Sequence, residues 1–176
     1  MNIFLTDKDP KIAAKHLDDL RLNKMILETA QLLSSAFREL NKDDWNELKY
    51  SHVYKKTHFN HPCSIWARKS LDNFTWLVNY FRELDQERYF RTSKRHKSFC
   101  LLYQTFEDSL STTRVKEESI LFNFNCSTYK DYEVTDAYKK YLNDKWYNDK
   151  KLPKWSNREL PYFLEDRVKD RIIKRV

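Results

Sequence analysis

The sequence predicts a mostly α-helical protein, folded as a compact, single-domain helical bundle with a short N-terminal strand or arm. Its 176 residues suit one domain with a substantial core, and 15% of them are aromatic, which argues against a disordered chain. Two helix-start signals, Asp9-Pro10 and His61-Pro62, each precede a long stretch with apolar residues at helical spacing. These observations favour α-helices over strands for most of the chain.

The N-terminal signal defines the first element. Residues 2–6 are predicted to be a short strand or an extended arm, after which Asp9 caps a helix that begins at Pro10. We expect this helix over about residues 10–40, with a break near residues 22–23. No repeat or linker follows, so we predict one domain, with the candidate site in its first part and a helical second half of unassigned role. The corresponding ranges are 1–176, 1–97 and 98–176.

The later elements follow in order. Residues 41–57 are predicted to be a loop with one turn of helix, followed by a helix from Cys63 to about Tyr89. Its predicted buried stripe consists of Trp66, Phe74, Leu77, Phe81 and Leu84. Further helices are predicted over residues 98–110, 132–147 (with Ala137, Tyr138 and Tyr141 inward) and 161–175. Residues 111–130 have no clear periodicity.

Composition restricts the function. The formal net charge of +7 favours a polyanionic partner, with nucleic acid first, although a basic surface without a partner gives the same count. The chain contains no glycine, which excludes a P-loop, a dinucleotide fingerprint and a nucleophile elbow. A glycine-free chain rich in lysine and asparagine also indicates an AT-rich genome, and we expect a phage protein.

The compartment is predicted from what the sequence lacks. No apolar run approaches the roughly 18 residues of a membrane span, and the first residues do not form a signal peptide. We therefore expect a soluble, cytoplasmic protein with no membrane partner. Cys63, Cys100 and Cys126 are odd in number and widely spaced, so we expect reduced, mostly buried thiols rather than disulfides.

The predicted first helix places charged groups on its apolar face. Ala13, Leu17, Leu20 and Leu27 share one face at helical spacing. The same face holds Lys24, Glu28 and Gln31, and His16 and Arg21 flank it. Burying such groups is costly unless they are paired or used, so this face is either a buried polar network or one wall of a polar site. In the second case His16, Arg21 and Gln31 are candidate substrate contacts, together with Trp66.

Lys24 and Glu28 are the first catalytic candidates. An amine in an apolar setting can act as a nucleophile, and a carboxylate one turn away can move its protons. Such an amine could attack a sugar C1′ and form an imine. The alternative is an ion pair between residues i and i+4 that only stabilises the helix.

Two further segments could bind substrate. A helix begins within residues 58–63, and Asn60 and His61 could bind a phosphate at its start. The spacing of the histidines and Cys63 matches no usual zinc pattern, so we expect no metal and no cofactor. Residues 88–97 contain five Lys or Arg interleaved with Tyr and Phe, which suits phosphate contact and base stacking. Its candidate contacts are Arg91, Arg95, His96 and Lys97. The alternative for residues 88–97 is a solvated helix end.

Together these residues form a recognisable set. The set consists of Asp18-Asp19-x-Arg21-Leu22-x-Lys24, Glu28, Gln31, Asn60-His61-Pro62 and Trp66, preceded by Ala13-x-x-His16-Leu17. It resembles the pyrimidine-dimer DNA glycosylases of the endonuclease V type, as a divergent phage or bacterial branch, over roughly residues 1–97. The resemblance implies a compact helical domain that binds duplex DNA, flips a nucleotide and cleaves its glycosidic bond through an imine, followed by β-elimination.

The resemblance also implies an α-amine nucleophile at a small second residue and a glutamate just after an arginine. Here position 2 is Asn2, whose bulk keeps the initiator methionine, so Met1 would present the amine. Leu22 follows Arg21, so Glu28 would supply the carboxylate. The amine is therefore Met1 or Lys24.

Three functions remain open from the sequence. The first is a DNA glycosylase and abasic-site lyase acting on damaged or modified pyrimidines. The second is a non-catalytic nucleic-acid-binding phage protein, and the third is an enzyme acting on a free nucleotide or modified base.

Overall fold

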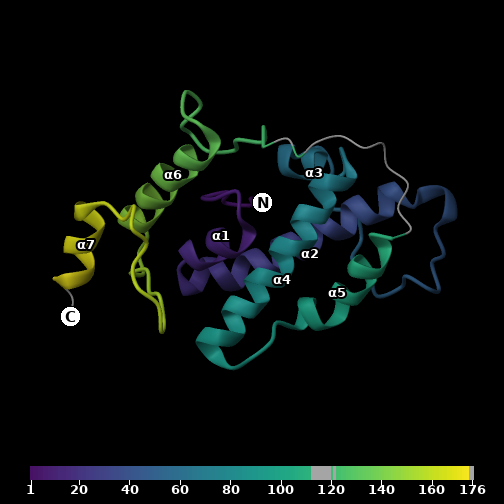
Figure 1. The fold of residues 1–176 in the computed structure, drawn as a ribbon, viewed down its shortest axis with the longest axis horizontal. Coiled ribbons are helices and arrows are strands. Elements are labelled where there is room, and N and C mark those ends of the chain that lie inside the picture. Colours follow the sequence, from purple (N-terminus) through teal and green to yellow (C-terminus); the bar gives the residue numbers. More distant parts are fainter. Residues whose placement is uncertain (112–119, 121, 175–176) are drawn as a thin grey trace.

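The computed structural model describes residues 1–111, 120 and 122–174, and these residues form α-helices joined by loops (Figure 1). No strand occurs within that part of the chain, so the predicted all-α class is confirmed. Residues 2–6 are an extended arm rather than a strand. Ile3 and Leu5 of this arm are fully buried, and the Tyr80 hydroxyl donates to the Ile3 carbonyl at 2.8 Å.

The first predicted helix is two helices, α1 (Pro10–His16) and α2 (Asp19–Leu40). The expected break near residues 22–23 was wrong; the chain breaks at Leu17 and Asp18, where the Asp18 side chain caps α2. The backbone carbonyls of His16 and Leu17, which the break leaves without a helical partner, are bonded to side chains. They accept hydrogen bonds from Trp155 Nε1 at 3.0 Å and Arg91 Nη1 at 2.8 Å. Partners distant in sequence therefore stabilise the break.

This break changes the face that α2 buries. Leu20 and Leu27, which helical spacing places on the apolar face, are 59% and 40% exposed, so α2 does not bury that face. Ile26 and Leu33 are fully buried instead. Ala13 and Leu17 are buried as expected, but they precede the break, so they do not set the rotation of α2. The strip with Lys24 thus faces outward.

The second predicted helix is also interrupted. After the 3-10 turn η1 (Lys42–Asp44), the chain forms α3 (Pro62–Ala67) and α4 (Leu71–Thr92) rather than one helix from Cys63 to Tyr89. The Ser70 hydroxyl caps α4 by accepting the Asn73 N–H at 3.1 Å. The predicted apolar stripe from Trp66 to Leu84 is nevertheless buried.

The last helices are α5 (Lys97–Ser109), α6 (Val134–Asn148) and α7 (Asp166–Ile173). The expectation that the final helix begins at residue 161 was wrong; Asn143 holds the preceding turn by donating to Phe163 O at 3.1 Å and accepting from Glu165 N at 2.8 Å. Its expected end at residue 175 and much of segment 111–130 lie outside the described residues.

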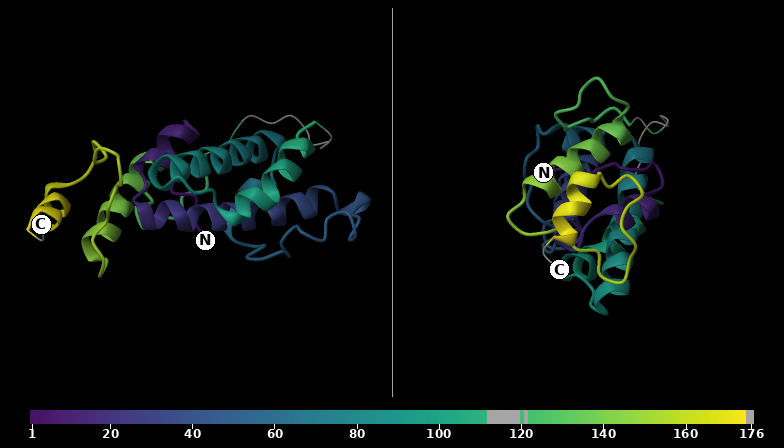
Figure 2. Two further views of the ribbon diagram at one scale, coloured as in Figure 1. Left: turned by 90° about the horizontal axis from the view of Figure 1, so that it is seen from below. Right: turned by 90° about the vertical axis from the view of Figure 1, so that its left-hand side faces the viewer.

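Helices α1, α2, α4 and α5 form the body, with α4 packed on both α1 and α2 (Figure 1). Helices α6 and α7 lie together at one end of the elongated molecule (Figure 2). Trp146 of α6 joins this end to the body by donating to Asp18 Oδ1 at 2.8 Å. The described helices include none that is both long and apolar enough to cross a membrane.

Candidate active site

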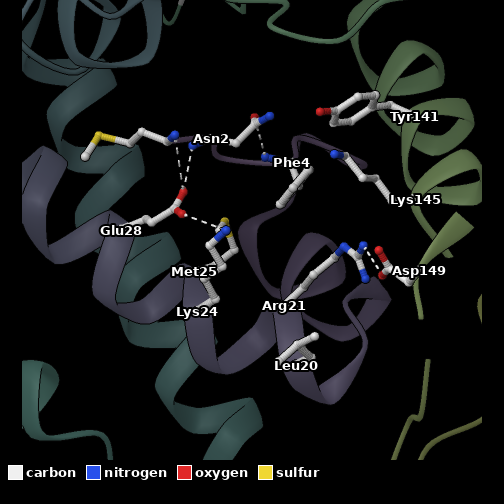
Figure 3. A pocket seen from close by; sticks show the side chains of 11 residues that line it. Asn2, Phe4, Leu20, Arg21, Lys24, Met25, Glu28, Tyr141, Lys145 and Asp149 are labelled. Carbon is white, nitrogen blue, oxygen red and sulfur yellow. Dashed lines mark hydrogen bonds and ion pairs between the residues drawn. The ribbon is translucent and has the colours of Figure 1, made fainter. Parts of the chain in front are cut away.

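A cavity of about 320 Å³ lies where the N-terminal arm, α2 and α6 meet (Figure 3). Its charged and polar walls include Met1, Asn2, Arg21, Lys24, Glu28, Tyr141, Lys145 and Asp149. Cationic groups outnumber carboxylates among these residues. The charge of the lining therefore suits an anionic ligand, and the volume suits one that inserts a single ring system.

The arm delivers the chain's α-amine to this cavity. The Met1 side chain is only 2% exposed, so its packing anchors the residue next to the amine. Asn2 Oδ1 accepts the N–H groups of Ile3 at 2.8 Å and Phe4 at 3.2 Å, and Phe4 has a positive φ of 52°. A left-handed conformation is unusual for a bulky aromatic residue, and here the buried neighbours of the arm hold it.

Glu28 is the centre of the polar groups around the amine. Its Oε2 accepts the Asn2 N–H at 2.8 Å and lies 4.0 Å from the Met1 amine, while its Oε1 lies 3.4 Å from Lys24 Nζ (Figure 3). The Glu28 side chain is 13% exposed and that of Lys24 is 66% exposed. The predicted trio of Met1, Lys24 and Glu28 therefore converges, as one carboxylate between two amines.

Arg21 forms the opposite part of the cavity wall. Its guanidinium pairs with Asp18 at 2.9 Å and with Asp149 at 2.6 Å, so it ties α2 to the end of α6. Because both partners are carboxylates, Arg21 shapes the cavity more than it adds free positive charge. Lys24 and Lys145 are the exposed cations at the rim.

His61 lies close to the amine from another direction. It caps α3, where its Nδ1 accepts the Cys63 N–H at 3.2 Å. Burial lowers the pKa of His61, the nearby N-terminal amine lowers it further, and Glu28 acts in the opposite sense. The bond from the Cys63 N–H also requires an unprotonated Nδ1, as in a neutral imidazole.

Two cysteines meet beside His61, although the sequence places them far apart. Cys63 Sγ and Cys126 Sγ are 3.5 Å apart. The hydrogen bond with Cys63 lowers the pKa of Cys126 to about 6, and the same contact raises the pKa of Cys63. All three cysteines are free thiols, but Cys100 is exposed and Cys126 half-buried, so the expectation of mostly buried thiols was wrong.

Several predicted substrate contacts lie away from the cavity. His16 is buried, its Nδ1 lies 3.0 Å from Thr6 Oγ1, and burial lowers its pKa to about 4. Trp66 is buried against Phe124, with 4.5 Å between ring centroids. Gln31 is half-buried and Asn60 exposed, and neither lines the cavity.

The basic segment 88–97 divides between interior and surface. The Arg91 side chain is 1% exposed and pairs with Glu87 at 2.8 Å and Asp19 at 3.0 Å. Arg95 pairs with the buried Asp85 at 2.7 Å, and its guanidinium lies over the Tyr89 ring. His96 caps α5, and burial lowers its pKa; Lys97 is exposed. None of Arg91, Arg95, His96 and Lys97 lines the cavity.

The wall that α6 supplies was not predicted from the sequence. Tyr141 and Lys145 lie one turn apart on α6, and Asp149 directly follows the helix, so the interval of four brings all three to the cavity. That spacing was readable from the sequence. Nothing local, however, indicated that these residues face the N-terminal arm.

The fold and the cavity define a helical protein whose N-terminal amine and a glutamate meet in a cationic pocket. The family model for pyrimidine dimer DNA glycosylases matches residues 1–100, and the chain belongs to this family. The membership makes DNA glycosylase its class of activity and DNA its substrate at the family level. No curated protein and no solved structure gives a significant match.

Proposed function

We propose that this chain excises damaged or modified pyrimidines from duplex DNA, with the Met1 α-amine as nucleophile and Glu28 as proton acceptor, and then cleaves the abasic strand. The observation that carries the proposal is the 4.0 Å separation between the amine and Glu28 Oε2 inside a cationic cavity. The Asn2 N–H fixes that oxygen at 2.8 Å, so the carboxylate is already oriented.

The reaction follows from these two groups. The free amine attacks C1′ of the flipped nucleotide, and the glycosidic bond breaks with its electron pair leaving on the base, which takes up a proton. Glu28 accepts a proton from the attacking nitrogen, and opening of the sugar ring at O4′ gives an imine. Loss of a C2′ proton then expels the 3′ phosphate, and water hydrolyses the imine to release the protein amine.

Lys24 is the competing amine, because its Nζ lies 3.4 Å from Glu28. The Met1 amine is the better placed of the two, because the buried Met1 side chain anchors it at the cavity. The Lys24 side chain is also largely in solvent. We therefore assign Lys24 to holding the carboxylate and to phosphate contact.

The outward strip of α2 suits DNA binding beside this cavity. Leu20 and Leu27 are exposed next to Lys24, and Leu20 also lines the cavity. Exposed apolar side chains of this kind can enter a base stack and help to extrude a nucleotide. Lys24 and Lys145 would then neutralise flanking phosphates. Asn60, Arg95 and Lys97 remain proposed contacts further along the duplex.

Borohydride trapping tests the proposal directly. We expect a covalent complex with dimer-containing or abasic duplex DNA but none with undamaged duplex, and peptide mapping should place the adduct on Met1. A two-residue N-terminal extension should abolish trapping, whereas Lys24→Ala should retain it with weaker DNA binding.

Two outcomes count against the mechanism. An adduct on Lys24 would transfer the nucleophile to the side chain. Absence of any trapped complex, together with salt-dependent DNA binding that survives Glu28→Gln and Lys24→Ala combined, would indicate a non-catalytic DNA-binding protein.

A further inference from the structure

Three metal-ligating side chains converge next to the arm, outside the cavity described above. One ligand atom each from His61, Cys63 and Cys126 lies within 4.8 Å of the others. Imidazole and thiolate are the ligands that zinc prefers in proteins. The third ligand comes from the loop before α6, which explains why the spacing around His61 gave no zinc pattern.

The distance between the two sulfurs suits a shared cation. With Zn–S bonds of about 2.3 Å and a tetrahedral angle, two thiolates on one zinc lie about 3.8 Å apart. The observed Sγ–Sγ distance is 3.5 Å. A disulfide needs about 2.05 Å, which would require a much larger movement of the two segments.

The hydrogen bond at the start of α3 identifies which nitrogen of His61 could bind a cation. Because a backbone N–H can only donate, its 3.2 Å bond from Cys63 identifies Nδ1 as the unprotonated nitrogen of His61. That lone pair accepts the Cys63 N–H, and a cation bound to Nδ1 would replace this long hydrogen bond. Nε2 would keep its proton, as metal-bound imidazoles do.

Cys126 is held independently of any ion. Its N–H donates to the Tyr138 hydroxyl at 3.1 Å, and this hydroxyl donates to the Phe124 carbonyl at 3.2 Å. The Phe124 ring packs on Trp66 of α3, so α3 and α6 both fix the loop. A site on such supports needs little reorganisation to bind.

We propose that His61, Cys63 and Cys126 bind one Zn²⁺ ion, with water as the fourth ligand. Cys63 is buried while His61 and Cys126 are half-buried, so solvent can reach the remaining position. The ion ties the loop before α6 to the start of α3, and thereby stabilises the wall beside the Met1 amine. This site does not depend on the proposed glycosylase mechanism.

Metal titration of the reduced full-length protein, stripped with a chelator, tests the site. We expect one equivalent of Zn²⁺ by elemental analysis, and Co²⁺ should give thiolate charge-transfer and tetrahedral visible bands. Excess Zn²⁺ should raise the thermal midpoint, because it binds only the folded state at this site. Cys63→Ser and Cys126→Ser should each weaken binding by more than about 100-fold, since even supporting residues of such sites cost 10–100-fold.

Cys100→Ser is the matched control, because Cys100 is an exposed free thiol that does not belong to the cluster. It should bind Zn²⁺ and Co²⁺ like the unmodified chain. If the cysteine variants fold poorly, His61→Asn tests the site instead. Asparagine also caps helices, so this variant should fold. Its Co²⁺ complex should lack the tetrahedral visible bands. No stoichiometric site in the unmodified protein, or equal affinity in the Cys63→Ser/Cys126→Ser double variant, overturns the proposal.

Discussion

Two groups of charged side chains meet α2, and they differ in how completely they are paired. The amine cluster consists of Met1, Lys24 and Glu28, and one carboxylate there lies between two amines. The ion-pair network consists of Asp19, Glu87, Arg91 and Arg158. Arg91 uses Nε, Nη1 and Nη2 on protein acceptors, and Arg158 makes two bonds of 2.8 Å to Glu87.

This difference separates a structural role from a chemical one. In the network, burial opposes ionisation of Glu87 and Asp19, but hydrogen bonds from arginine and serine lower the pKa of both carboxyls. Buried charges with every donor satisfied hold segments together and are costly to disturb. In the amine cluster, a cavity opens on the groups instead, so a substrate can replace water there. Incomplete pairing beside a cavity, rather than charge itself, marks the candidate site.

The largest expected effect is on the rate of base excision in Glu28→Gln. Loss of the proton acceptor should slow single-turnover excision of a damaged pyrimidine by about 10²–10⁴-fold. Glutamine keeps an oxygen for the Asn2 N–H, so the thermal midpoint should change little. Glu39→Gln is the control on the same helix, because Glu39 pairs with Lys56 far from the cavity. Equal losses in both variants would remove Glu28 from the chemistry.

The next largest effect is on stability, in Arg91→Met. This change leaves Glu87 and Asp19 with fewer donors and frees the Leu17 carbonyl, so the free energy of unfolding should fall by about 3–5 kcal/mol in urea denaturation. Arg167→Met is the control, because Arg167 makes an exposed pair with Asp144, and should cost no more than about 1 kcal/mol. Unchanged stability with weakened DNA binding would restore Arg91 as a phosphate contact.

The sequence predicted helix starts well because caps are local. Asp9 and His61 cap the helices that begin at Pro10 and Pro62. The breaks depended on distant partners, and no periodicity of the first 40 residues could show that Trp155 and Arg91 would bind the carbonyls between α1 and α2. The wrong face of α2 followed from that missed break.

The candidate site also has a part that the local sequence predicts and a part that depends on distant segments. Met1, Lys24 and Glu28 were predictable because the latter two are one helical turn apart and the family resemblance added the amine. The convergence of Cys126 on His61 and of Lys145 on the arm required the path of the loop before α6. Arg91 and His16 were misleading, because a charged or imidazole group has the same sequence signature whether it faces solvent or a buried partner.

The smallest expected effect is the contribution of His16 to the pH dependence of the free energy of unfolding. His16 is a predicted substrate contact that, like the ion-pair network, is buried in the fold. Burial lowers its pKa from 6.5 to about 4, so the unfolded chain binds this proton more readily. The stabilisation is complete above pH 6.5 and is lost as the pH falls toward 4. Relative to His16→Gln, the unmodified chain should lose about 1–2 kcal/mol of its free energy of unfolding over this window, after allowance for the partly solvated ring.

Urea denaturation at several pH values measures the difference, and His52→Gln controls for the removal of a histidine. Parallel pH curves for the unmodified chain and His16→Gln would show that the ring titrates as if exposed, and would return His16 to the candidates for substrate contact.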